Sequence, residues 1–184
     1  GGRLTESHCG LLELRAHETY RTLDMIAEHA SRSWSVECEC GEAILQGQGV
    51  PIQIAICHCN DCRTARGGDA STHTLVLVRR DQLTTAFDGI KAVSGSEYLD
   101  LVPRYFCDSC GDWMVGDCTS IGFDMALLPR DRISSQRTLG EPDYHMHLEQ
   151  KITEPRKDGL PRFQGNPEDP YMAELIEKCA NGPL

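Results

Sequence analysis

The cysteines constrain this sequence more than any other feature. The 184-residue chain contains ten of them, and seven stand in three tight groups: Cys38-Glu39-Cys40, Cys57-His58-Cys59-Asn60-Asp61-Cys62 and Cys107-Asp108-Ser109-Cys110. Cysteines this close in sequence rarely form a disulfide with each other, but they can direct two or three thiolates to one point, as metal ligands do. We therefore expect bound metal, zinc above all, instead of disulfides.

The first and third groups together offer four thiolates, from Cys38, Cys40, Cys107 and Cys110. A Zn²⁺ ion held by four cysteines is closed to other ligands and serves structure. The two pairs are 67 residues apart, so a shared ion would join an early hairpin to a late one. Its binding energy would then contribute to folding.

The middle group, Cys57, Cys59 and Cys62, is odd in number and predicts another kind of site. Three thiolates leave a tetrahedral zinc ion one open position, as in catalytic sites, unless Cys118, His73 or a water closes it. Such a centre carries a net charge of about −1, so it should activate water poorly but accept a soft thiol as fourth ligand. It suits a thiol substrate better than hydrolysis.

Short alternating segments between Trp34 and Leu148 predict a mainly β fold of small antiparallel sheets. Residues 9–30 have the apolar spacing of a helix. Asp169-Pro170 is a typical helix start, followed by an apolar stripe of Met172, Leu175, Ile176 and Cys179, with Gly182 as a stop. We divide the chain into an N-terminal helical extension (1–33), a zinc domain (34–165) and a C-terminal helix on the same domain (166–184).

The formal net charge of −10 is spread along the chain, which disfavours nucleic acid as a partner. No segment approaches the roughly 20 consecutive apolar residues needed to cross a bilayer, and the N-terminus lacks a secretory pattern. We expect a cytoplasmic location, no membrane partner and a small-molecule thiol or carbonyl substrate. The extra N-terminal helix is compatible with a homodimer.

The motifs Cys38-x-Cys40-Gly41, Cys57-His58-Cys59-x-x-Cys62-Arg63 and Phe106-Cys107-x-x-Cys110-Gly111, in this order, resemble the glutathione-dependent formaldehyde-activating enzyme (GFA, or CENP-V/GFA domain) family. The segments Pro142-Asp143-Tyr144-His145 and Asp158-Gly159-Leu160-Pro161-Arg162-Phe163 resemble its C-terminal pattern. The resemblance covers residues 34–165 and implies an Mss4-like fold. It also implies two Zn²⁺ per chain: a structural ion on the four cysteines and a labile one on the three, near bound glutathione.

The family's named activity joins formaldehyde to glutathione, and many members are classed as carbon–sulfur lyases. This chain departs from the pattern at its N-terminal helix and at Asp112-Trp113, where a small residue is commoner. It also lacks a tryptophan after Lys151 and has a second histidine, His147. These departures surround the cysteines without replacing them, so they bear on the substrate and not on the metal sites.

Three polar residues are candidates for catalysis beside the cysteines. His58 could shuttle protons or be a fourth ligand, although strand geometry favours a supporting position facing away from Cys57 and Cys59. His145 shares one face of its expected strand with His147, as a metal pair, an acid–base pair or a half-exposed face. Asp112 could be a base, the partner of a histidine or a solvated turn residue.

Four further residues are candidates for substrate binding. Arg63 and Arg66 could bind a carboxylate of glutathione, or form ion pairs on an acidic protein. Gly67 could let a ligand approach the backbone, or serve a turn. Trp113 could be a substrate platform or a core residue.

Three functions compete. The first is a zinc-dependent carbon–sulfur lyase that handles a glutathione adduct of formaldehyde or another reactive carbonyl. The second is a zinc-dependent tailoring enzyme, a lyase, isomerase or epimerase, acting on a larger carbonyl metabolite. The third is a binding module without catalysis, in which both metal sites are closed.

Overall fold

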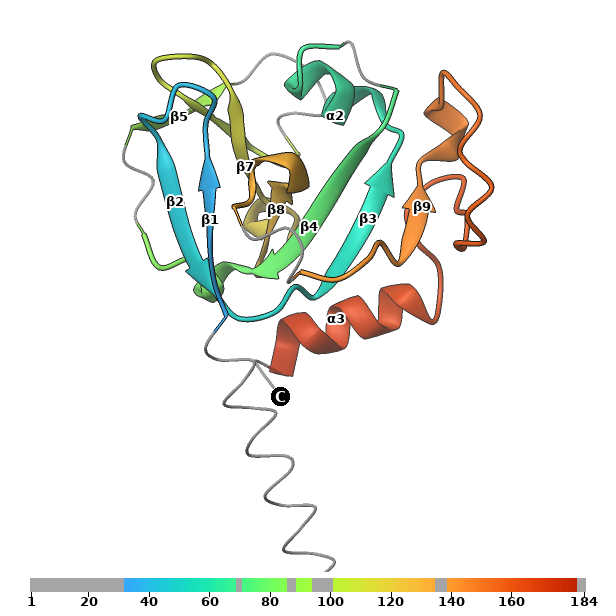
Figure 1. Ribbon diagram of the computed structural model, residues 1–184. Helices are drawn as coiled ribbons and strands as arrows, with labels where there is room; N and C mark the ends of the chain where they lie inside the picture. The colour runs from blue at the N-terminus through green and yellow to red at the C-terminus, as the bar shows by residue number, and fades with distance from the viewer. Residues whose placement is uncertain (1–31, 69–70, 86–88, 94–100, 135–138, 182–184) are drawn as a thin grey trace, which may run out of the picture.

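The computed structural model describes residues 32–68, 71–85, 89–93, 101–134 and 139–181 (Figure 1). The nine strands of the described chain are β1 (Ser33–Glu37), β2 (Ile44–Gln48), β3 (Gln53–Cys57), β4 (His73–Arg79), β5 (Ile90–Val93), β6 (Arg104–Cys107), β7 (Trp113–Asp117), β8 (Met125–Pro129) and β9 (Tyr144–Met146). Its two α-helices are α2 (Asn60–Ala65) and α3 (Tyr171–Asn181). Short 3₁₀ turns are η1 (Arg80–Gln82), η2 (Thr119–Ile121), η3 (Arg130–Arg132) and η5 (Leu148–Gln150). The predicted helix at 9–30 lies outside the described residues.

The strands form two sheets, which confirms the mainly β fold class. β1 and β2 make an antiparallel hairpin, and the other seven strands form one sheet in the order β5-β6-β7-β8-β4-β3-β9. This second sheet is larger than the small sheets expected, and its edge strand β9 runs parallel to β3. Sequence periodicity could not reveal the long sheet, because its neighbours β3 and β9 are far apart in the chain.

The strand β4, which lies between β8 and β3 inside the long sheet, faces two hydrophobic cores. Val76 and Val78 point into the first core, beside the hairpin residues Trp34 and Val36. Leu75 and Leu77 of the same strand point into the second core. Since successive side chains of a strand face opposite sides, a continuous apolar run indicates a strand covered on both faces.

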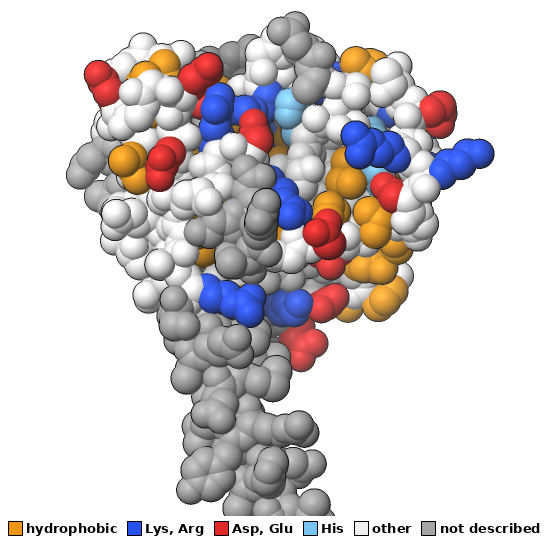
Figure 2. All heavy atoms as spheres, viewed as in Figure 1, with side chains coloured by type: hydrophobic (Ala, Val, Ile, Leu, Met, Phe, Trp, Pro, Cys, Tyr) orange, Lys and Arg blue, Asp and Glu red, His pale blue; other side chains and the backbone are white. Residues whose placement is uncertain are grey.

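The second core is closed by the C-terminal helix, which crosses one end of β3 and β4 (Figure 1). Leu175 of α3 is 4% exposed within this core, and Met172 and Cys179 pack against it. Ile176, a member of the predicted apolar stripe, is 50% exposed and lies outside this core. Hydrophobic side chains gather at the right of the space-filling view, over β9 and α3 (Figure 2). The predicted stop at Gly182 lies outside the described residues, and α3 ends at Asn181.

The expected strand that carries His145 and His147 is shorter in the structure than predicted. β9 ends at Met146, and His147 adopts a left-handed backbone conformation with φ of 58°. This conformation is uncommon for a residue with a side chain. His145 and His147 therefore do not share a strand face, contrary to the expectation.

The contrast between Leu175 and Ile176 gives a test of how α3 is held. Leu175→Ala should lower the free energy of unfolding by about 2 to 3 kcal/mol, because it removes a buried side chain and leaves a cavity. Ile176→Ala, on the exposed side of the same helix, should change it by less than about 1 kcal/mol. Urea denaturation of both variants measures the difference. Equal losses would show that α3 does not pack through Leu175.

Candidate metal centres

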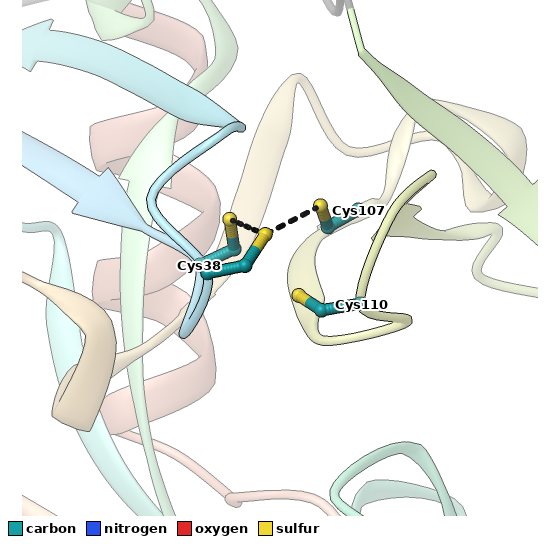
Figure 3. Close-up of side chains that lie close together, drawn as sticks. Cys38, Cys107 and Cys110 are labelled. Atoms are coloured by element: carbon teal, nitrogen blue, oxygen red, sulfur yellow. Dashed lines mark hydrogen bonds between the residues drawn. The ribbon is translucent and has the colours of Figure 1, made fainter.

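The four-cysteine cluster lies where the β1–β2 hairpin meets the turn between β6 and β7. Cys38, Cys107 and Cys110 direct their sulfurs toward one another across this junction (Figure 3). The Cys40 Sγ lies 3.4 Å from the Cys38 Sγ and 3.8 Å from the Cys107 Sγ, and all four sulfurs lie within 4.8 Å of one another. Tetrahedral zinc with sulfur at about 2.3 Å needs sulfur–sulfur separations of about 3.8 Å. The four thiols therefore fit a zinc ion.

The backbone at this cluster is shaped to support thiolates. The Ala43 amide donates to the Cys38 Sγ at 3.1 Å. Backbone amides at Cys40 and Asp112 lower the pKa of the Cys110 thiol to about 7. Gly111 follows with φ of 74°, which its lack of a side chain permits. These contacts favour the charged form that binds a cation.

The three-cysteine cluster lies at the opposite face of the sheet, against the second core. Cys57 ends β3, Cys59 is the N-cap of α2 and Cys62 lies in the first turn of that helix. These three residues are 1%, 8% and 2% exposed, and their sulfurs lie within 4.8 Å of one another. The Cys62 amide donates to the Cys59 Sγ at 3.3 Å, so the helix start also orients a metal ligand.

Burial makes three neighbouring thiolates unstable without a cation. Hydrogen bonds from the Cys57 and Cys62 thiols lower the pKa of Cys59. The same contact with Cys59, together with Cys62 and burial, raises the pKa of Cys57 well above its usual value. One thiolate is favoured at the expense of the others, and a metal ion would remove this competition.

Neither protein residue considered as a fourth ligand belongs to the three-cysteine cluster. Cys118 is buried, and burial raises its pKa to about 12, but its sulfur is outside the group of mutually close ligand atoms. His73 pairs with Cys57 across β4 and β3, yet its ring is outside the group as well. Within the described residues, the cluster thus has three candidate ligands, and a water is the remaining candidate for the fourth.

Arg104 is a functional candidate that sequence reasoning missed. The first residue of β6, it is 4% exposed, and its Nη2 donates to the Cys62 Sγ at 3.8 Å. The Nη1 donates to the Val102 carbonyl at 2.9 Å, and the guanidinium lies 5.4 Å from the centre of the Trp113 ring. A single arginine at the start of a strand has no distinctive sequence signal.

Two buried histidines form a hydrogen-bonded chain beside the three-cysteine cluster. His58 Nε2 lies 3.0 Å from His145 Nδ1, and His145 Nε2 lies 2.9 Å from an Asp158 carboxylate oxygen. With the carboxylate as acceptor, His145 donates from Nε2 and its Nδ1 accepts from His58. Burial, followed by the neighbouring His145, lowers the pKa of His58 to about 4. His58 is therefore neutral at pH 7, and its ring is not among the close metal-ligand atoms.

The two arginines after the three-cysteine motif already have partners. Arg63 Nη1 donates to the carbonyls of His58 and Gln150, at 2.7 and 2.8 Å. Arg66 pairs with Asp112 at 2.6 Å and also with Asp131. Arg66 thus has the carboxylate partners that the ion-pair interpretation expects.

Asp112 is an ion-pair centre, and no histidine is among its partners in the described part of the chain. It lies 2.6 Å from both Arg66 and Arg132, and its carboxylate accepts the Glu39 amide at 3.1 Å. Asp112 follows the turn that carries Cys107 and Cys110, whereas Arg66 is the C-cap of α2. Asp112 therefore joins the two clusters, and the same residues line an open cavity of about 230 Å³ with Gly67 and Cys110.

Trp113 has no exposed surface and packs in the second core with the three cysteines. Its burial agrees with the alternative of a core residue, since a platform for substrate needs an exposed ring face. Gly67 has φ of 86°, and a Cβ added there would meet no heavy atom within 4 Å, so the backbone at this turn is open.

In the described residues, no helix has the length and the apolar character that a membrane span requires.

A mainly β fold with two cysteine clusters that fit metal ions defines a cysteine-ligated metalloprotein. The family model of the glutathione-dependent formaldehyde-activating enzyme (GFA) matches residues 33–150, more than half of the sequence. The chain belongs to this family. Among curated proteins, no significant match was found. A crystal structure of a Rhodobacter sphaeroides protein is similar over 70% of this chain and 98% of its own, with 12% identity and a TM-score of 0.41.

Asp112 provides a test of the link between the clusters. Asp112→Ala should lower the free energy of unfolding by about 2 to 3 kcal/mol, because Arg66 and Arg132 lose a partner that is 10% exposed. Glu154→Ala, which breaks an exposed pair with Lys151, should change it by less than about 1 kcal/mol. Chemical denaturation of the metal-loaded variants makes the comparison. A loss no larger than that of Glu154→Ala would show that this ion-pair network adds nothing to stability.

The two clusters should bind metal independently. The zinc-loaded chain should contain two ions, and Cys110→Ser and Cys59→Ser should each lose one, because each removes a thiolate from a different cluster. Cys118→Ala, which changes a buried cysteine outside both clusters, should keep two. Metal analysis after removal of free zinc gives the count. Two ions in Cys59→Ser would contradict a site on the middle cysteines.

Proposed function

We propose that this protein is a zinc-dependent carbon–sulfur lyase that handles the glutathione adduct of formaldehyde or of another reactive carbonyl. One observation carries the proposal. Cys57, Cys59 and Cys62 gather three buried thiols, and no fourth protein ligand joins them among the described residues. Membership of the GFA family supports an enzyme of this kind.

The soft, negatively charged ligand set indicates the substrate class. Zinc on three thiolates would hold a substrate thiol in its nucleophilic, deprotonated form and would do little to activate water. The protein contributes a rigid frame for this centre. The Cys59 Sγ caps α2, and Arg63 ties the loop before that helix to Gln150 of η5. A fixed geometry of this kind lowers the entropic barrier for joining two reactants.

The reaction balances without any further reagent. In the forward direction the sulfur of the thiol forms a bond to the carbonyl carbon, and the π electron pair moves to the oxygen. The proton lost from the thiol ends on that oxygen, giving the S-hydroxyalkyl product. The reverse direction breaks the same carbon–sulfur bond and returns the proton to sulfur, so one site serves both directions.

Asp158, His145 and His58 support this proposal through their hydrogen bonds. Their chain connects the exposed Asp158 with His58, which stands between two candidate ligands in the sequence. In the tautomer set by Asp158, the His58 Nδ1 is an acceptor, and it is buried without a partner among the described residues. We assign this chain the task of holding the cysteine loop and His58 in a fixed orientation.

Calorimetric titration of glutathione into the zinc-loaded protein tests the proposal. Binding should occur in the wild type and in Cys118→Ala but disappear in Cys59→Ser, because only the last variant loses a thiolate of the open centre. With ¹³C-formaldehyde, NMR should show faster exchange with S-hydroxymethylglutathione than in buffer. Failure of glutathione to bind a chain that holds two zinc ions would overturn the glutathione assignment. It would favour a larger carbonyl substrate or a binding module.

A further inference from the structure

Arg104 carries a buried positive charge at the three-cysteine cluster. Its side chain combines 4% exposure with a hydrogen bond to the Cys62 Sγ at 3.8 Å. The described structure gives it no carboxylate partner in an ion pair, although Asp61 lies near enough to interact with it electrostatically. A buried arginine without a paired carboxylate is rare, because an uncompensated charge in the interior is unfavourable. The charge that compensates Arg104 must then come largely from the sulfurs.

The surroundings of Arg104 hold the guanidinium in place. The Nη1 donates to the Val102 carbonyl, and the cation lies over the Trp113 ring. The Nε is buried and has no hydrogen-bond partner among the described residues. Trp113 is fully buried, so the guanidinium cannot move away into solvent on that side. Arg104 is thus held beside Cys62, although this position leaves the buried Nε–H without a hydrogen-bond acceptor among the described residues.

A charge count suggests what this position achieves. Three thiolates and a divalent ion have a net charge of about −1. A thiolate as fourth ligand would make the net charge more negative, about −2. In a buried site, accumulating negative charge is strongly unfavourable. The positive charge of Arg104 offsets one negative charge in both cases. The stabilisation is larger for the centre with a thiolate as fourth ligand, because that centre carries more negative charge, and smaller for the centre with a neutral ligand.

We propose that Arg104 is a specificity-determining residue that makes the three-cysteine centre select an anionic thiolate over a neutral fourth ligand. This inference rests on the proposed function and names the residue that gives its site a preference. Arg104 acts through charge and does not bind the metal. Arg63 and Arg66 cannot take this role, since their guanidinium groups are engaged with carbonyl oxygens and carboxylates.

The test uses Co²⁺-loaded protein, because the visible ligand-field absorption of Co²⁺ changes when either a thiolate or a neutral ligand binds at the open position. Two probes are titrated: glutathione, which binds as a thiolate, and imidazole, which binds as a neutral ligand. In Arg104→Met the Kd for glutathione should rise at least tenfold, while the Kd for imidazole should change less than threefold. Arg104→Lys, which keeps the charge, should recover at least half of the selectivity on a logarithmic scale.

Arg79→Met is the matched control. Arg79 is also largely buried, but it pairs with Asp81 and contacts the end of α3, away from the cysteines. It should leave both constants unchanged. Should Arg104→Met not fold, Arg104→Gln replaces it, because the amide can still donate to the Val102 carbonyl.

The outcomes separate the inference from the proposed function. Equal weakening of both probes in Arg104→Met would show that Arg104 only supports the structure and would overturn the inference. So would unchanged glutathione binding. Absence of glutathione binding to the wild type, with imidazole still bound, would overturn the proposed function. It would also overturn the inference, since the centre would then have no preference for thiolates.

Discussion

The burial of β4 on both faces determines where the two cysteine clusters lie. Its valines belong to the first core, together with Cys38 and Cys107, and its leucines belong to the second, together with Cys57, Cys59 and Cys62. Each cluster thus rests on its own apolar core. Such a base is rigid because protein interiors are close-packed. Rigidity matters for a metal site, since sulfur positions must match a fixed geometry.

The two clusters differ in what surrounds the sulfurs. In the four-cysteine cluster, Cys40 and Cys110 are exposed and backbone amides support the thiolates. The three-cysteine cluster is wholly buried, and a guanidinium reaches one of its sulfurs. Solvent screens charge at the first cluster but not at the second. Among the described residues, the cluster with three candidate ligands is thus also the one with a buried cation beside it, where a change in ligand charge has the largest effect.

The sequence predicts the structure best where the residues themselves carry the chemistry. Cysteine spacing predicted both clusters, and the alternation of apolar residues predicted the mainly β class. The sequence does not predict contacts between residues that are distant in the chain. Asp112 meets Arg66 and Arg132 only because the four-cysteine turn packs beside the end of α2. Arg104 lies beside Cys62 only because β6 joins the long sheet, and the sequence around either residue indicates neither contact.

His147 shows how a local prediction can fail next to a candidate metal site. Its neighbours alternate as a strand should, yet the backbone turns to the left-handed region and starts η5. That turn brings the Gln150 side chain to the Asn60 amide at 2.8 Å and the Gln150 carbonyl to Arg63. The energy of the unusual conformation is thus offset by contacts that fix the start of α2, where Cys59 and Cys62 are held. Departure from the regular strand is therefore part of how the three-cysteine cluster is positioned.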